Sequence, residues 1–261
     1  MKDSPNIDRN LSFYNSTAAD YDSMLSRFPG DLWVREAFHE LVTQTVPRGG
    51  LLLDFGCGTG TDAVWYARHG HRVIAYDYSS GMMQQLRRKC AQEIDRGAVL
   101  PYEGSWPTFL KQSVCHGRPR AILANFAVLN CIHDLRALFD NWAAVLGPGD
   151  WAIVSVLNLH YWKEFARPSR WTSQQSGTRL PKSGADMDTY LHSVREISAA
   201  AAPKFRIAFH ASVAFLIRYT AGPRDWWQPR SFAEKIERRL WRTLPVSRLG
   251  RFLFIGLRRV P

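Results

Sequence analysis

The feature that most constrains this chain is an apolar run followed at once by alternating glycines. Leu51–Phe55 is apolar except for Asp54, and glycine stands at positions 56, 58 and 60. Glycine adopts positive φ without strain, so such a turn lets backbone N–H groups approach a ligand closely. Helix-forming residues follow and stop at Gly70, which suits the position after a helix. A strand, a glycine-rich turn and a helix start predict a nucleotide or adenosine site, although a tight turn without a ligand stays an alternative.

A second apolar segment ends in an acid at the spacing of a ribose contact. His71–Tyr78 reads as a strand, and its Asp77 lies 19 residues beyond Gly58. Dinucleotide-binding folds place there the carboxylate that accepts hydrogen bonds from ribose hydroxyls. The turn has the pattern G-x-G-x-G, and Thr61 stands where the nicotinamide fingerprint G-x-G-x-x-G has its third glycine. The pattern therefore favours a ligand with adenosine but without a diphosphate.

Strand-like and helix-like segments alternate along most of the chain, which predicts an α/β fold with a parallel sheet. Strands are expected near 51–55, 72–77, 98–103, 121–127, 151–157, 205–217 and 252–257. Residues 188–202 read as a helix. Asp134 is expected to cap a helix that ends at Leu146.

Several segments, in order, resemble the motifs of class I S-adenosylmethionine-dependent methyltransferases. Asp54–Gly60 has the form of the family's first motif, and Asp77–Met82 is similar to its second-strand segment. Glu103–Trp106 falls where the family usually has Gly-Asp, and Ser105 stands in place of the acid that contacts adenine. Ala124–Asn130 is similar to the end of the fourth strand, which lies under the methionine part of the cofactor.

The resemblance continues through Val145–Leu157, similar to the family's fifth strand and the turn before it, and through Phe13–Asp22, similar to the lid of small-molecule members. It implies a Rossmann-like doubly wound sheet of seven mostly parallel strands, with the seventh antiparallel between the fifth and sixth. It also implies S-adenosyl-L-methionine as cofactor and S-adenosyl-L-homocysteine as product. The cofactor-binding residues that it implies are Asp54, Gly56, Cys57, Gly58, Gly60, Asp77, Tyr78, Met82, Ser105, Trp106, Asn125 and Phe126.

One domain with insertions is expected, because 261 residues with 46% apolar content can fill one α/β core. Its expected parts are an N-terminal helical lid (1–48), a cofactor-binding core (49–158), a cap over the active site (159–187) and a C-terminal sheet part (188–261). The four cysteines are scattered, which indicates a reducing compartment and no structural zinc or other metal site. Without a signal-like start or a transmembrane run, a cytoplasmic protein is expected, and its oligomeric state stays open.

The net charge of +11 is concentrated near the C-terminus. Residues 223–261 contain ten Lys or Arg against three acids, a local charge of +7. Phe232, Ile236 and Leu240 recur every four residues, so 223–248 is expected to hold an amphipathic helical insertion with a basic face. Three interpretations stay open: the helix packs on the domain with a solvated basic face, it touches anionic lipid, or it tracks a phosphate backbone.

The expected chemistry asks the protein to bind the cofactor, align the acceptor and exclude water, because the methyl group moves by direct in-line displacement. A phenol or alcohol acceptor benefits from a base, whereas an amine needs little more than alignment. The candidates are His133 after the fourth strand, His160 after the fifth, His192, and Tyr21 on the lid. His133 alternatively precedes a helix cap and faces solvent.

Candidate acceptor contacts come from the lid and from the strand ends. Tyr14 lies on the lid, Asn130 follows the fourth strand as a hydrogen-bond partner, and Tyr161 and Trp162 offer an aromatic wall. Ordinary core packing is the alternative for these rings. Asp62, just inside the first helix after the glycine turn, either helps to hold the methionine end or simply suits a helix N-terminus.

These observations predict methyl transfer from S-adenosylmethionine to an O, N or C atom of a small molecule, such as a secondary metabolite in biosynthesis. The alternatives are an RNA or lipid-linked acceptor bound through the basic C-terminal segment, transfer of a different group or cyclisation, and a cofactor-binding scaffold without activity. A nucleic-acid partner is not favoured, since no separate RNA-binding module accompanies the domain.

Overall fold

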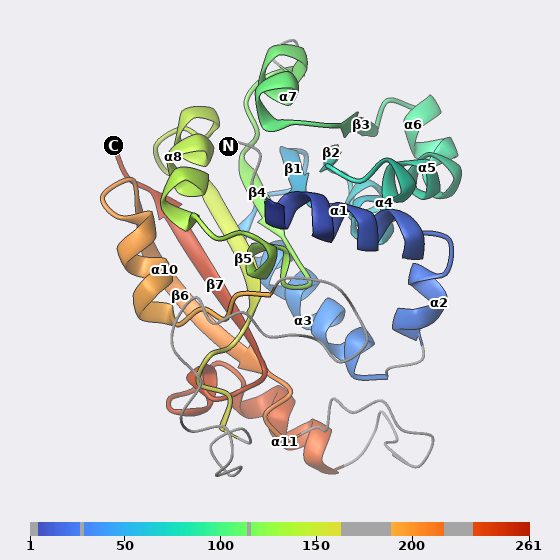
Figure 1. Cartoon of the computed structure of the whole chain (residues 1–261). Coiled ribbons are helices and arrows are strands. Elements are labelled where there is room, and N and C mark those ends of the chain that lie inside the picture. Colours follow the sequence, from blue (N-terminus) through green and yellow to red (C-terminus); the bar gives the residue numbers. More distant parts are fainter. Residues whose placement is uncertain (1–4, 27–28, 114–115, 163–188, 217–231) are drawn as a thin grey trace.

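A seven-stranded sheet organises the computed structural model, which describes residues 5–26, 29–113, 116–162, 189–216 and 232–261 (Figure 1). The strand order is β3-β2-β1-β4-β5-β7-β6, and β7 runs antiparallel to both of its neighbours. The expected α/β fold with an antiparallel seventh strand is confirmed. The strands are β1 (Leu51–Phe55), β2 (Arg72–Asp77), β3 (Val99–Glu103), β4 (Ala121–Ala124), β5 (Trp151–Leu157), β6 (Phe205–Val213) and β7 (Phe252–Arg259).

Helices cover both faces of this sheet, and the lid crosses its carboxyl edge (Figure 1). The lid helices are α1 (Pro5–Thr17) and α2 (Tyr21–Ser26). The other α-helices are α3 (Pro29–Thr45), α4 (Thr61–Arg68), α5 (Ser80–Lys89), α6 (Ala91–Asp95), α7 (Trp106–Ser113), α8 (Leu135–Val145), α10 (Val194–Ala201) and α11 (Phe232–Leu240), and short 3₁₀ turns are η2 (Val128–Cys131) and η4 (Val246–Arg248). Among the described helices, none combines the length and apolar content that crossing a membrane requires.

The central strands are apolar on both sides because each side faces a separate core. Leu52 packs in the cluster beneath α3, α4 and α5, whereas Leu53 packs in the cluster beneath α7, α8 and α10. Successive side chains of a strand point to opposite faces, so a strand buried on both faces reads as a continuous apolar run. The Asp134 side chain accepts a hydrogen bond from the Ala137 N–H, which caps α8 as expected. The run at 51–55 therefore lies in the middle of the sheet and aims its end at the carboxyl edge.

Several element boundaries differ from the sequence-based ones. β4 stops at Ala124 because Phe126 and Ala127 take left-handed conformations, with φ of 54° and 64°, which a strand cannot contain. β6 similarly stops before Ala214, whose φ is 59°. α10 begins only after Ser193, whose side chain forms a capping box with Glu196. The expected cap at 159–187 lies outside the described residues from position 163 onward.

Candidate functional site

A cavity of about 370 Å³ lies where β1, β2 and β4 end, beneath the lid helices. In parallel α/β sheets this carboxyl edge, outside the strand ends, is where ligands bind. The lining comes from the glycine turn, from the strand ends, and from α1, α2 and α3. Eleven of the twelve expected cofactor-binding residues line it, and the exception is Gly60.

The glycines of the turn serve different purposes. Gly56 has a φ of 72°, and a Cβ there would lie 2.6 Å from the Val128 side chain. The end of β1 and η2 can therefore pack this closely only because residue 56 has no side chain. Gly58 has a φ of 54° and open space where its Cβ would be, which leaves its backbone bare to the cavity. Gly60 packs against α5 instead, because a Cβ there would lie 2.8 Å from the Cys90 sulfur.

The N–H groups of the glycine turn are used within the protein. Gly56 and Cys57 both donate to the Tyr76 carbonyl, at 2.8 and 3.0 Å, and Gly58 donates to Asp77 Oδ2 at 2.8 Å. A diphosphate site needs such groups free to point at the ligand. The geometry thus agrees with the sequence pattern in favouring a ligand without a diphosphate.

Asp77 joins the glycine turn to the start of α5. Its Oδ1 accepts from the Ser79 N–H at 2.9 Å, and burial raises its pKa while the backbone donors of Ser79 and Gly58 lower it. A carboxylate offers about four acceptor positions, and two of these are in use. The remaining positions can accept hydrogen bonds from a diol in the cavity.

Asp54 is the carboxylate of the site that has an unsatisfied oxygen. It is 2% exposed, and its Oδ2 has no hydrogen-bond partner in the described structure. Burial, reinforced by the nearby negative charge of Asp62, raises the pKa of this carboxyl well above its usual value. Buried acceptors are nearly always paired, so an orphan beside a cavity points to a donor supplied by a ligand.

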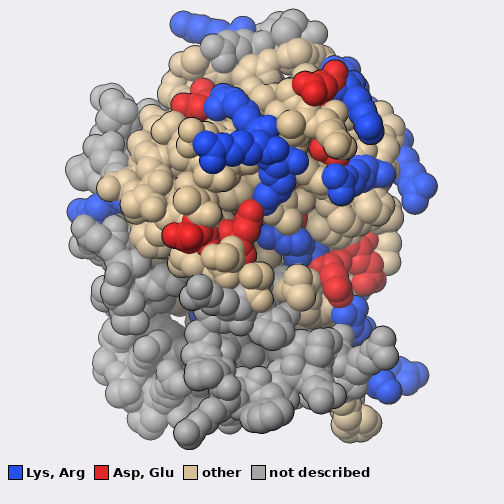
Figure 2. Space-filling model, turned by 90° about the vertical axis from the view of Figure 1, so that its right-hand side faces the viewer, with Lys and Arg blue, Asp and Glu red and all other residues tan. Residues whose placement is uncertain are grey.

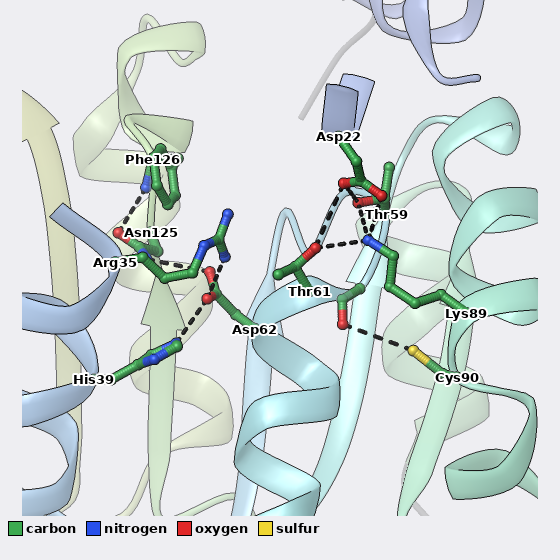
Figure 3. A network of polar contacts seen from close by, with 11 residues as sticks. Asp22, Arg35, His39, Thr59, Thr61, Asp62, Lys89, Cys90, Asn125 and Phe126 are labelled. Atoms are coloured by element: carbon green, nitrogen blue, oxygen red, sulfur yellow. Dashed lines mark hydrogen bonds and ion pairs between the residues drawn. The ribbon is translucent and has the colours of Figure 1, made fainter. Parts of the chain in front are cut away.

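Asp62 holds three side chains from other elements together (Figure 3). It accepts from Arg35 Nη1, from His39 Nε2 at 2.7 Å and from Asn125 Nδ2 at 3.1 Å. Burial acts to raise the pKa of Asp62, but the Arg35 charge and the His39 hydrogen bond outweigh it and hold the pKa below its usual value. Asp62 is therefore a fixed anion that positions Arg35.

Arg35 is a cavity residue that sequence reasoning missed. Its guanidinium lies 4.4 Å from the Phe126 ring centroid and lines the cavity beside Asn125. The available signal was an arginine among the apolar residues Trp33, Val34, Ala37 and Phe38 of α3. A partly buried cation held by an acid can still direct its other N–H groups to a ligand, since guanidinium has five donors.

The lid is fastened to the glycine turn and α5 at two places. Asp22 accepts from Thr59 Oγ1 at 2.6 Å and pairs with Lys89 Nζ at 2.5 Å (Figure 3). Asn15 Oδ1 accepts from the Gly81 N–H at 3.0 Å, and a Cβ on Gly81 would lie 3.0 Å from the Asn15 carbonyl oxygen. The lid therefore closes over the cavity at contact distance.

The tyrosines of the lid form the roof of the cavity. Tyr14 OH lies 3.6 Å from Cys131 Sγ, and the Tyr14 and Tyr21 rings meet edge to face at 6.2 Å. Burial raises the pKa of the Tyr14 phenol well above its usual value, so it stays protonated. Apolar side chains also line the cavity, among them Leu25, Val128 and Ile132.

The candidate histidines lie outside the cavity lining. His133 and His160 are exposed, and His133 meets Tyr190 edge to face. His192 is buried against the Leu129 carbonyl, and burial lowers its pKa. These placements do not support a role as base, because none of the three histidines is among the residues that line the cavity.

Three expected acceptor contacts also lie elsewhere. Asn130 is 1% exposed and ties η2 to its neighbours, accepting from the Leu157 N–H at 2.8 Å and donating to the Tyr190 carbonyl at 2.5 Å. Tyr161 is buried outside the lining, and Trp162 Nε1 donates to the Phe215 carbonyl at 2.8 Å. Asn130 and Trp162 thus have hydrogen-bond partners within the described residues. No group of three or more His, Cys, Asp or Glu side chains there could hold a metal ion.

Comparison with known proteins identifies the family. The model of the methyltransferase domain family matches residues 31–197, more than half of the chain. YqeM of Bacillus subtilis (strain 168), a methyltransferase by name, is 30% identical over 76 residues, and the match spans 29% of each protein. The chain belongs to the methyltransferase domain family. The prediction of an S-adenosylmethionine-dependent methyltransferase is confirmed.

Solved structures show the same fold at low identity. The CcbJ methyltransferase of Streptomyces caelestis has a TM-score of 0.59 at 18% identity, covering 95% of this chain and 98% of its own. A protein solved for the conversion of a disulfide bond into a thioacetal group during echinomycin biosynthesis has a TM-score of 0.54 at 19% identity, covering 86% and 80%. A shared fold does not fix the acceptor, which depends on the site.

Proposed function

We propose that this enzyme transfers the methyl group of S-adenosylmethionine to a small, largely apolar acceptor held under the lid tyrosines. The observation that carries the proposal is the mixed lining of one cavity. Asp54, Asp77 and Arg35 supply charged groups, and aliphatic and aromatic side chains supply apolar surface. The charged groups suit a cofactor with an amino-acid end, and an apolar acceptor gains by burial against the apolar side chains.

The cavity fits the adenosine part of the cofactor. Asp77 would accept from the two ribose hydroxyls through its spare lone pairs, and Tyr78 and Met82 would flank the adenine. Ser105, which replaces the family's acid, is bonded to Thr108 Oγ1 at 2.9 Å at the start of α7. Trp106 lines the same end, and its buried indole N–H has no partner in the described structure, so it can donate to an adenine ring nitrogen.

The cavity also fits the amino-acid end. Asp54 Oδ2 is a buried acceptor without a donor, and the cofactor's ammonium group would supply one. Arg35, fixed by Asp62, would direct its remaining N–H groups to the carboxylate. Opposite charges would then meet in a site of low dielectric, where such pairs are strong.

The described lining favours an acceptor that needs no base. It contains no histidine, and its three carboxylates lie at the cofactor end. Tyr14 stays protonated and can donate a hydrogen bond or orient the acceptor, but cannot remove a proton. The cofactor supplies an electrophilic methyl group, so alignment and exclusion of water are the protein's task. An amine or a thiolate fits this surrounding better than an alcohol.

The acceptor class is tested by incubating the enzyme and a cell extract with S-adenosylmethionine labelled in its methyl group. We expect label in the low-mass fraction and S-adenosylhomocysteine as the second product. A label found only in RNA or lipid would overturn the small-molecule proposal, and methylthioadenosine would indicate transfer of a different group. The echinomycin relative, which acts in the biosynthesis of a small molecule, supports the first outcome.

The cofactor site is tested by calorimetric titration with S-adenosylhomocysteine. Asp77→Ala should weaken binding roughly 100-fold or more, because two hydrogen bonds to a charged group are lost. Asp95→Ala, which removes an exposed acid of α6, is the matched control and should bind as wild type. Equal affinity of both variants would exclude the ribose assignment.

A further inference from the structure

The apolar stripe of α11 faces outward. Phe232 is 79% exposed and Leu240 38%, and Leu244 just beyond the helix is 68% exposed. The opposite side of the helix is buried, with Glu237 at 0% and Trp241 at 4%. The expected amphipathic helix is present over 232–240, while 223–231 lies outside the described residues. Its sequence stripe is not the side that packs on the domain.

Buried contacts fix this orientation. Glu237 Oε1 accepts from Trp33 Nε1 at 3.0 Å and from the Ala214 N–H at 2.5 Å, and Oε2 accepts from the Leu216 N–H at 2.8 Å. Turning the stripe inward would break all three bonds and leave buried polar groups unpaired, which is strongly unfavourable. The exposed stripe is therefore a stable feature of the folded chain.

Cations flank the stripe. Residues four apart lie along one line of a helix, so Lys235 and Arg239 form a row beside Phe232, Ile236 and Leu240. Both cations are exposed and have no ion pair in the described structure. On the far side of this row, Arg238 pairs with Glu36 at 2.7 Å. We call the set Phe232, Lys235, Ile236, Arg239, Leu240 and Leu244 the α11 face.

The other basic region of the molecule is different. Figure 2 shows the side that carries α5 and α6, where Lys and Arg lie among acids. Arg68 pairs with Glu93 at 2.9 Å, and Arg87 pairs with Glu103 at 3.1 Å. Acids pair with these two cations, whereas Lys235 and Arg239 of the α11 face have no ion pair among the described residues. The α11 face also sets its cations directly beside a row of exposed apolar side chains.

We propose that the α11 face docks on an anionic membrane surface. An outward row of Phe and Leu beside Lys and Arg is the pattern with which helices lie in the interface, the rings among the acyl chains and the cations at the headgroups. A phosphate backbone would use the cations but gain little from two exposed leucines. None of the residues of the α11 face lines the cavity, so docking through this face does not use the cavity lining.

The test is co-sedimentation of the whole chain with two kinds of vesicle. One contains phosphatidylcholine alone, and the other contains in addition about 30% phosphatidylglycerol, which gives the surface a negative potential. We expect binding only to the anionic vesicles, weakened by salt. Lys235→Glu/Arg239→Glu should reduce the partition coefficient about 30-fold or more, since each basic residue near such a surface contributes roughly five-fold. Phe232→Ser/Leu240→Ser should reduce it about ten-fold.

Matched controls change exposed residues outside the α11 face. Arg72→Glu/Arg96→Glu makes the same change in net charge with exposed residues, and Met24→Ser removes an exposed apolar side chain of α2. Both should sediment as wild type, and all variants should bind S-adenosylhomocysteine normally, which shows that they are folded. Absent vesicle binding, or equal losses in the controls, would overturn the proposal. Loss of binding to a labelled single-stranded RNA, with vesicle binding unchanged, would assign the face to nucleic acid instead.

Discussion

Two buried carboxylates near the same edge of the sheet have opposite surroundings. Glu237, on the buried side of α11, receives three hydrogen bonds and is completely enclosed. Asp54, beside the cavity, is almost as buried but has an oxygen without a partner. A satisfied carboxylate fixes one element on another, whereas an unsatisfied one keeps a binding capacity at the expense of stability. The difference separates a structural region from a ligand site on physical grounds.

The largest effect is expected at Glu237. Glu237→Leu should lower the free energy of unfolding by about 3–6 kcal/mol, because three buried donors lose their acceptor. Urea unfolding followed by circular dichroism measures this change. Glu36→Leu, at an exposed acid that pairs with the same helix, is the control and should change stability by less than about 1 kcal/mol. A similar small effect of both variants would contradict the structural role of Glu237.

Asp62 should show an intermediate effect on stability and a strong one on binding. Asp62→Asn removes the charge that holds Arg35 and His39, and we expect a loss of about 1–3 kcal/mol in urea unfolding. Affinity for S-adenosylhomocysteine should fall at the same time, because Arg35 loses its fixed position. Normal affinity would show that Arg35 is oriented without Asp62.

Asp54 should behave in the reverse way to Glu237. Asp54→Asn should leave the free energy of unfolding within about 1 kcal/mol of wild type, since the lost oxygen has no partner. Its affinity for S-adenosylhomocysteine should fall roughly ten-fold or more, because the ammonium loses a charged acceptor. A variant that is strongly destabilised but binds normally would abolish the distinction between the two carboxylates.

The smallest predicted effect is the release of a proton when the ligand binds. Burial raises the pKa of Asp54 in the free protein, and a cationic ligand group favours its charged form and lowers that pKa. Binding should therefore release a proton, and affinity should rise with pH through the raised pKa. Calorimetric titrations in buffers of different ionisation enthalpy measure this release. It should vanish in Asp54→Asn, and proton uptake in wild type would contradict the assignment.

The cofactor half of the site was predictable because its determinants are local in the sequence. Asp54 lies at the end of β1, the glycine turn joins β1 to α4, and Asp77 ends the next strand, β2. Because these segments are close in sequence, their spacing alone predicts that Asp77 lies beside the glycine turn. The histidines after β4 and β5 were a weaker prediction, because spacing along the chain does not fix where side chains beyond a strand end come to lie. After β4, for example, the left-handed Phe126 and Ala127 change the path of the backbone.

By itself, the sequence determined the strand pattern, the adenosine-type turn and the family, since these depend on the chemistry of neighbouring residues. Only the tertiary structure decided that Arg35 enters the cavity, because its partner Asp62 lies on another helix. It also decided which side of α11 is buried. Periodicity gives a helix two faces but does not say which one packs, and here the partners of Glu237 on α3 and after β6 made that choice.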